Sequence, residues 1–142
     1  MTMQPEESFA RVLDLELKRA ERYRIFISMI VFDLSLVREI TNGGAESAID
    51  GTVELIRKNI REIDNVVAMS DCRVGLLFPE TPRQGAEIVS KRLTELIRSY
   101  ISALVKSDLG ELIPLEMVSY PDAAGAKSMS SYLEELLASK KN

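Results

Sequence analysis

The sequence predicts an α/β sandwich in which a mostly antiparallel central sheet is flanked by helices. Short apolar segments rich in β-branched and aromatic residues alternate with longer segments whose apolar residues recur at helical spacing. The apolar segments 65–69 and 73–78 are separated by only three polar or small residues, which indicates a hairpin. The predicted order is helix, strand, helix, hairpin, helix, strand, helix, which is typical of a sheet covered by helices.

Each predicted element in the first half of the chain has its own signature. Pro5 and the two glutamates after it suit the first turn of a helix, and apolar residues then recur at helical spacing. The segment 25–34 is apolar at successive positions, so we expect a strand buried on both faces, with Asp33 near its end. After a break at 41–44, helical spacing returns at 48–60.

The second half continues the alternation. Thr81 and the proline after it open a long helix with a continuous apolar face. The segment 112–120 predicts another strand, and Pro114 favours a place at the edge of the sheet because proline cannot donate to a strand ladder. A short final helix is predicted at 130–139.

Length and composition limit the number of domains and the classes of function that the chain can have. The 142 residues suffice for one core, so we expect a single domain over 1–142, with flexible ends at 1–7 and 140–142. The net charge of −4 argues against general binding of nucleic acid or anionic membranes. Without histidine, and with Cys72 as the single cysteine, we expect no disulfide, metal centre or cofactor. No apolar run could span a bilayer and no signal peptide is evident, so we expect a cytoplasmic location.

The segment 64–81 resembles the signature region of GGDEF (diguanylate cyclase) domains, which reads D-x-V-A-R-Y-G-G-D-E-F-x-x-L-L-P-x-T. The flanks agree, whereas the signature itself is replaced by Ser70-Asp71-Cys72-Arg73-Val74. Further segments in register with the family are 19–23, 30–35 and 86–97. The resemblance implies a GGDEF, nucleotidyl-cyclase-like fold.

The departures from the family imply that catalysis is lost. Diguanylate cyclases join two GTP molecules, with metal ions held by an acid on the first strand, matched by Asp33, and by another in the hairpin. Cys72 stands at that second position and Arg73 beside it, and magnesium is poorly bound by a thiol and repelled by a guanidinium. Ser70 and Asp71 replace the glycines that admit the triphosphate.

The positions that match the family's guanine-contacting residues agree only in part. Thr41 replaces the asparagine that contacts guanine, although Asp50 matches its companion acid. We expect Asp33 only to cap the next helix, because its metal partner has gone. These positions are therefore interpreted as vestigial, with no catalytic residue among them.

One binding site of the family is retained. The segment 61–64 matches the R-x-x-D motif at which many GGDEF domains bind their product, cyclic di-GMP, and Arg92 matches a further arginine of that site. An arginine pairs with phosphate or with guanine O6 and N7, and a carboxylate accepts from guanine N1 and N2. The resemblance implies a cyclic di-GMP site at Arg61, Asp64 and Arg92, made more basic by Arg57.

Three functions stay open on the sequence alone. The first is an inactive module that binds cyclic di-GMP and relays the signal to an unidentified protein partner. The second is a nucleotide-independent interaction or dimerisation domain that docks through its first or long helix, in which case Arg61 and Asp64 form only a surface ion pair. The third is a residual cyclase, which rests on Asp33 and Asp50 alone.

Overall fold

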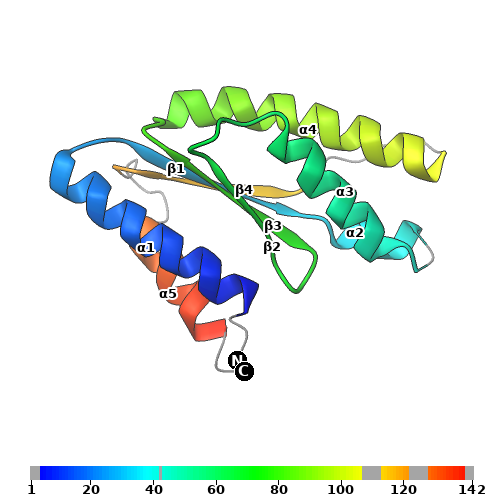
Figure 1. The fold of residues 1–142 in the computed structure, drawn as a ribbon, viewed down its shortest axis with the longest axis horizontal. Coiled ribbons are helices and arrows are strands. Elements are labelled where there is room, and N and C mark those ends of the chain that lie inside the picture. The colour runs from blue at the N-terminus through cyan, green and yellow to red at the C-terminus, as the bar shows by residue number, and fades with distance from the viewer. Residues whose placement is uncertain (1–3, 42, 107–112, 122–127, 140–142) are drawn as a thin grey trace.

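The computed structural model describes residues 4–41, 43–106, 113–121 and 128–139. Its elements are, in order, α1 (Pro5–Tyr23), β1 (Ile27–Asp33), α2 (Ser35–Ile40), α3 (Ala45–Arg57), β2 (Asn65–Ala68), β3 (Arg73–Pro79), α4 (Arg83–Val105), β4 (Leu115–Tyr120) and α5 (Met129–Ser139). The predicted α/β sandwich is confirmed (Figure 1). No helix in these described ranges is long and apolar enough to cross a membrane.

The four strands of the sheet lie in the order β2-β3-β1-β4. β1 pairs antiparallel with β3 on one side and β4 on the other, and β2 pairs antiparallel with β3 to form the predicted hairpin. β1 is therefore central, which explains its continuous run of apolar residues. The edge position predicted for the strand after Pro114 is confirmed by β4.

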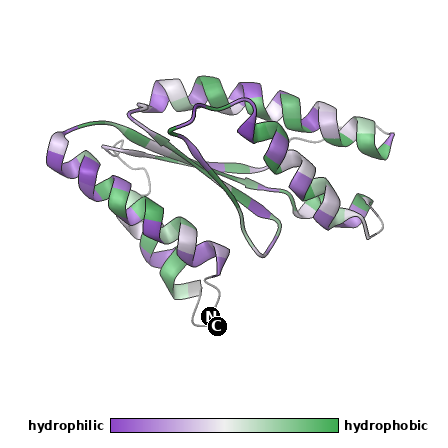
Figure 2. Ribbon diagram, in the orientation of Figure 1, coloured by the Kyte–Doolittle hydropathy of each residue, from purple (hydrophilic) through white to green (hydrophobic). Residues whose placement is uncertain are grey.

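Helices cover both faces of the sheet. α1 and α5 lie on one face, and α3 and α4 lie on the other (Figure 1). Successive residues of β1 point to opposite faces, so Met29 and Val31 pack with α1 and α5, whereas Ile30 and Phe32 pack with α3 and α4. Figure 2 shows the central strands to be mostly hydrophobic, while each helix carries both hydrophobic and hydrophilic positions.

The structure differs from the sequence prediction in one short helix and in the bounds of some elements. α2 was not predicted because its six residues are too few for a helical period to be evident. α3 spans Ala45–Arg57 instead of 48–60. α1 begins at Pro5, as predicted, and Glu6 is buried and bonded to the hairpin turn. The flexibility expected for 1–7 stays a prediction. The segment 140–142 lies outside the described residues.

Candidate functional site

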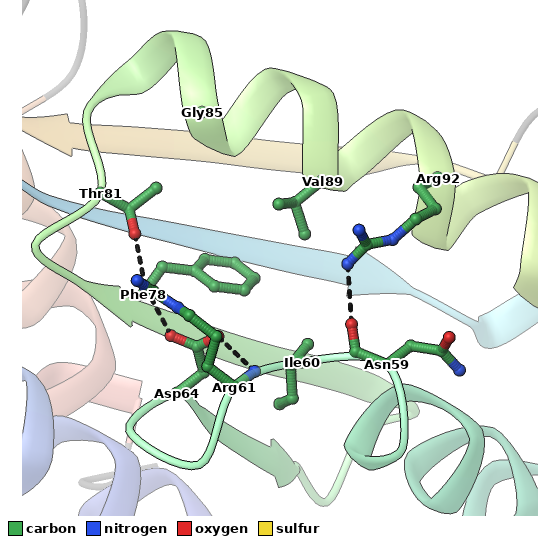
Figure 3. A pocket seen from close by; sticks show the side chains of 9 residues that line it. All are labelled: Asn59, Ile60, Arg61, Asp64, Phe78, Thr81, Gly85, Val89 and Arg92. Carbon is green, nitrogen blue, oxygen red and sulfur yellow. Dashed lines mark hydrogen bonds and ion pairs between the residues drawn. The ribbon is translucent and has the colours of Figure 1, made fainter.

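A pocket of about 310 Å³ lies between α4 and the segment that joins α3 to β2. Arg61, Asp64 and Arg92 all line it, so the structure brings together the three residues that the sequence analysis grouped as one site. Figure 3 shows Arg61 and Arg92 towards opposite ends of the pocket, with Phe78 and Val89 between them. The pocket thus combines two cationic ends with an apolar middle.

Asp64 and the loop between β3 and α4 fix the orientation of Arg61. Nε and Nη2 of Arg61 donate to the Asp64 carboxylate at 3.3 and 2.9 Å. Nη2 also donates to the Pro79 carbonyl at 2.9 Å and to Thr81 Oγ1 at 2.7 Å. Among the described residues Nη1 has no hydrogen-bond partner, and the Arg61 side chain is 51% exposed. Nη1 of Arg61 is therefore able to donate hydrogen bonds to a ligand.

The Asp64 carboxylate acts within the protein. Its side chain is only 3% exposed, and besides the guanidinium it accepts the backbone N–H of Arg61 at 2.8 Å. Asp64 thus lines the pocket and also holds Arg61 in place. The direct contact expected between Asp64 and a ligand stays a prediction.

Arg92 closes the other end of the pocket. Its Nη2 donates to the backbone carbonyl of Asn59 at 2.7 Å, which joins α4 to the segment after α3 (Figure 3). Because a guanidinium has five N–H donors, this single bond leaves donors for an anion. The neighbouring cation Lys91 is exposed and does not line the pocket.

A side chain of α1 accepts hydrogen bonds from the hairpin turn. Ser70 donates through its backbone N–H and its hydroxyl to Glu6 Oε1, each at 2.6 Å. Burial by itself raises the pKa of Glu6, but the hydrogen bonds from Ser70 outweigh it and hold the pKa below its ordinary value of 4.5. The Ser70 amide, at the place of a family glycine, is thus already bonded to an internal carboxylate.

This bond makes the stability of the fold depend on pH. Since the folded-state pKa of Glu6 is lowered, its stabilising contribution is complete above the unfolded pKa of about 4.5 and is lost as the pH falls through the folded value. We expect Glu6→Gln to lower the free energy of unfolding at pH 7 by about 1–2 kcal/mol. The difference from the wild type should shrink below pH 4.5, as measured by urea denaturation. An equal difference at pH 7 and pH 3 would contradict this role.

The two residues at the family's metal-binding positions are engaged within the protein. Arg38 Nη2 donates to Cys72 Sγ at 3.0 Å, and Cys72 is buried. Asp33 Oδ1 accepts the backbone N–H of Ser35, the first residue of α2, at 2.9 Å. Across the described ranges, no group of three or more His, Cys, Asp or Glu side chains could hold a metal ion.

Arg73, Asp71, Asp50 and Thr41 complete the positions singled out in the sequence. Arg73 Nε donates to Asp71 at 2.7 Å, and this hydrogen bond is the main cause that raises the pKa of Arg73 above its ordinary value. Arg73 therefore stays cationic at the turn. Asp50 is exposed on α3, and Thr41 uses its hydroxyl to bond the Val37 carbonyl at 2.7 Å.

Sequence reasoning missed residues that complete the two regions. Glu6 was interpreted only as an acid favourable to a helix start, and Ser70 lies 64 positions away. Phe78 belongs to a plain apolar strand, and Asn59 contributes a backbone carbonyl, which no side-chain pattern reveals. The position of Asp64 immediately before a strand was a usable signal, because such a carboxylate is readily enclosed by the turn that precedes it.

No family model matches the chain, and no curated protein matches it in sequence. Solved structures do match. The GGDEF domain of TpbB from Pseudomonas aeruginosa has a TM-score of 0.66 and 16% identity, covering 95% of this chain and 88% of that one. The GGDEF domain of DgcB from Caulobacter crescentus, in complex with cyclic di-GMP, has a TM-score of 0.63 and 19% identity, covering 96% and 84%.

A third match is the diguanylate cyclase SiaD from Pseudomonas aeruginosa, in complex with its activator SiaC. Its TM-score is 0.68 at 15% identity, with 96% of this chain and 54% of that one covered. Identities this low establish the fold alone. The chain has the fold of the GGDEF domains of diguanylate cyclases.

Proposed function

We propose that this chain is a catalytically inactive GGDEF-like signalling module that binds cyclic di-GMP between Arg61 and Arg92 and relays binding to a partner protein. One observation carries the proposal: a pocket with two oriented guanidinium groups lies at one end of the β2–β3 hairpin, while the turn at its other end is bonded to its own chain. Cyclic di-GMP carries two phosphates and two guanines, and both chemical groups suit this pocket.

The charges and apolar surfaces of the pocket support this ligand. Nη1 of Arg61 and the unused donors of Arg92 can each form charge-assisted bonds with a phosphate or with guanine O6 and N7. Such bonds contribute about 1.5–3 kcal/mol each, and together with apolar contacts to the bases they support micromolar binding. Ile60 and Val89, both partly buried, offer apolar contact to a base. Asp64 pre-orients Arg61, which reduces the entropy lost on binding.

Calorimetric titration with cyclic di-GMP tests the binding site. We expect the wild type to bind in the micromolar range and Arg92→Ala to bind about tenfold more weakly, because a charge-assisted bond is lost. Lys91→Ala is the matched control, since it removes a neighbouring exposed cation that does not line the pocket. Arg61→Ala should abolish the heat. The absence of heat from the wild type at high micromolar ligand would end the proposal.

The hairpin supports the absence of cyclase activity. The reaction needs divalent cations and an open approach for the triphosphate, whereas Cys72 is buried against Arg38 and the Ser70 amide is bonded to Glu6. Incubation with GTP and magnesium, followed by chromatography, is therefore expected to yield no cyclic di-GMP. Detectable product would contradict this interpretation of the hairpin and favour a residual cyclase.

A nucleotide-independent interaction domain is the second candidate, and one surface favours it. Tyr23 and Phe26 lie at the end of α1 with 59% and 51% of their surfaces exposed, and Arg24 lies between them in the sequence. Aromatic and arginine side chains are enriched among the residues that dominate protein interfaces. A partner or a second copy that binds equally with or without cyclic di-GMP, and equally to Arg61→Ala, would favour this candidate.

A further inference from the structure

A second pocket, of about 300 Å³, adjoins the first. Ile60, Arg61 and Asp64 line both pockets, so they form a shared wall. The second pocket is completed by residues from the end of α3, the following turn and β2: Arg57, Glu62, Asn65 and Val66. A ligand held by Arg61 therefore adjoins two pockets. The second pocket is lined by a carboxylate, Glu62, and a guanidinium, Arg57.

The two charged side chains of this pocket match the edges of a guanine. Guanine presents the acceptors O6 and N7 on one side and the donors N1–H and N2–H on the other. A guanidinium such as that of Arg57 donates to the first pair, and a carboxylate such as that of Glu62 accepts from the second. Asn65 adds an amide that both donates and accepts.

Both charged groups are available to a ligand. Glu62 is exposed, and no hydrogen bond or ion pair engages it within the described residues. Arg57 pairs with Glu54 at 2.9 Å, but both side chains are more than half exposed, so the pair is weak and can be exchanged for a ligand. Asp64, the acid of the R-x-x-D motif, is enclosed and fully engaged with Arg61.

From these contacts we infer that Glu62 selects guanine over adenine, while Arg57 donates to the other edge of the base. This inference rests on the proposed function, because Arg61 must hold the phosphate of the same ligand. Adenine presents an acceptor at N1 where guanine presents a donor, so the Glu62 carboxylate would face a lone pair and disfavour adenine.

Titration of cyclic di-GMP and cyclic di-AMP against the same variants tests the inference. We expect the wild type to prefer cyclic di-GMP by at least about tenfold. Glu62→Gln keeps the shape of the side chain but offers a donor as well as an acceptor, so cyclic di-GMP should bind about tenfold more weakly and the preference should nearly vanish. Glu21→Gln, which removes an exposed charge on α1, is the matched control and should change neither affinity.

The results of these titrations distinguish failure of the Glu62 inference from failure of the proposed function. Wild type that binds cyclic di-GMP, together with a Glu62→Gln variant of unchanged preference, would overturn the role of Glu62 and leave the pocket between Arg61 and Arg92 standing. In contrast, Arg92→Ala should weaken both ligands by the same factor, because it does not line the second pocket. Wild type that binds neither ligand would overturn both proposals.

Discussion

Asp64→Ala is expected to lower the free energy of unfolding by about 2 kcal/mol and to abolish binding of cyclic di-GMP. The Asp64 carboxylate is enclosed and accepts the backbone N–H, Nε and Nη2 of Arg61. Hydrogen bonds to a charged group contribute about 1.5–3 kcal/mol, and the half-exposed guanidinium reduces the sum through solvent screening. Urea denaturation at pH 7 measures the stability and calorimetry the binding.

Glu62→Ala is the control for the change in stability alone, because Glu62 is an exposed acid of the same turn. We expect it to change the free energy of unfolding by less than about 0.5 kcal/mol. An Asp64→Ala variant as stable as Glu62→Ala would mean that the Arg61–Asp64 pair is an ordinary surface ion pair. The orientation of Arg61 would then need another cause.

Phe78→Ala is expected to have the largest effect on stability, a loss of about 3–5 kcal/mol. The Phe78 side chain is buried in the core between the sheet and the helices α3 and α4, and it also forms the base of the first pocket. Removing the ring leaves a cavity next to the first pocket. Thermal and urea denaturation measure the loss, and Phe78→Leu should recover most of it because it keeps an apolar side chain of similar volume.

Ile88→Ala provides the comparison for Phe78→Ala on the adjoining helix. Ile88 lies on α4 and is highly exposed, so we expect a change within about 0.5 kcal/mol. Equal losses for Phe78→Ala and Ile88→Ala would contradict the packing described for this face of the sheet.

Much of the fold could be predicted because it depends on local patterns. The two apolar segments around Ser70-Asp71-Cys72 predicted the hairpin, and the structure has β2 and β3 there. Pro114 predicted an edge strand, and β4 lies at the edge. Arg61 and Arg92 were grouped through a resemblance, and the folded chain places both around one pocket. Short elements such as α2 carry too few residues for a period to be evident.

The finer features of the site could not be predicted because they depend on contacts between distant parts of the chain. Nothing in the segment around Ser70 indicates a hydrogen bond to Glu6. That bond depends on the packing of α1 against the sheet. The low exposed fraction of the Asp64 side chain likewise follows from the surrounding turn.

Two residues of the hairpin turn form bonds to helices. Ser70 provides a hydroxyl for Glu6, and Cys72 provides a sulfur acceptor for Arg38. Each bond joins the turn to a helix, α1 or α2, from opposite faces of the sheet. The turn therefore contributes to stability, and we propose that the signalling chemistry rests on the pocket at Arg61.

NMR titration of the isotope-labelled wild type with cyclic di-GMP measures directly where the ligand binds. The proposed function predicts saturable shifts of the amide signals of Arg61, Glu62 and Arg92, while the signals of Ser70 and Cys72 stay unchanged. Shifts concentrated at Ser70 and Cys72, or no shifts at millimolar ligand, would contradict it.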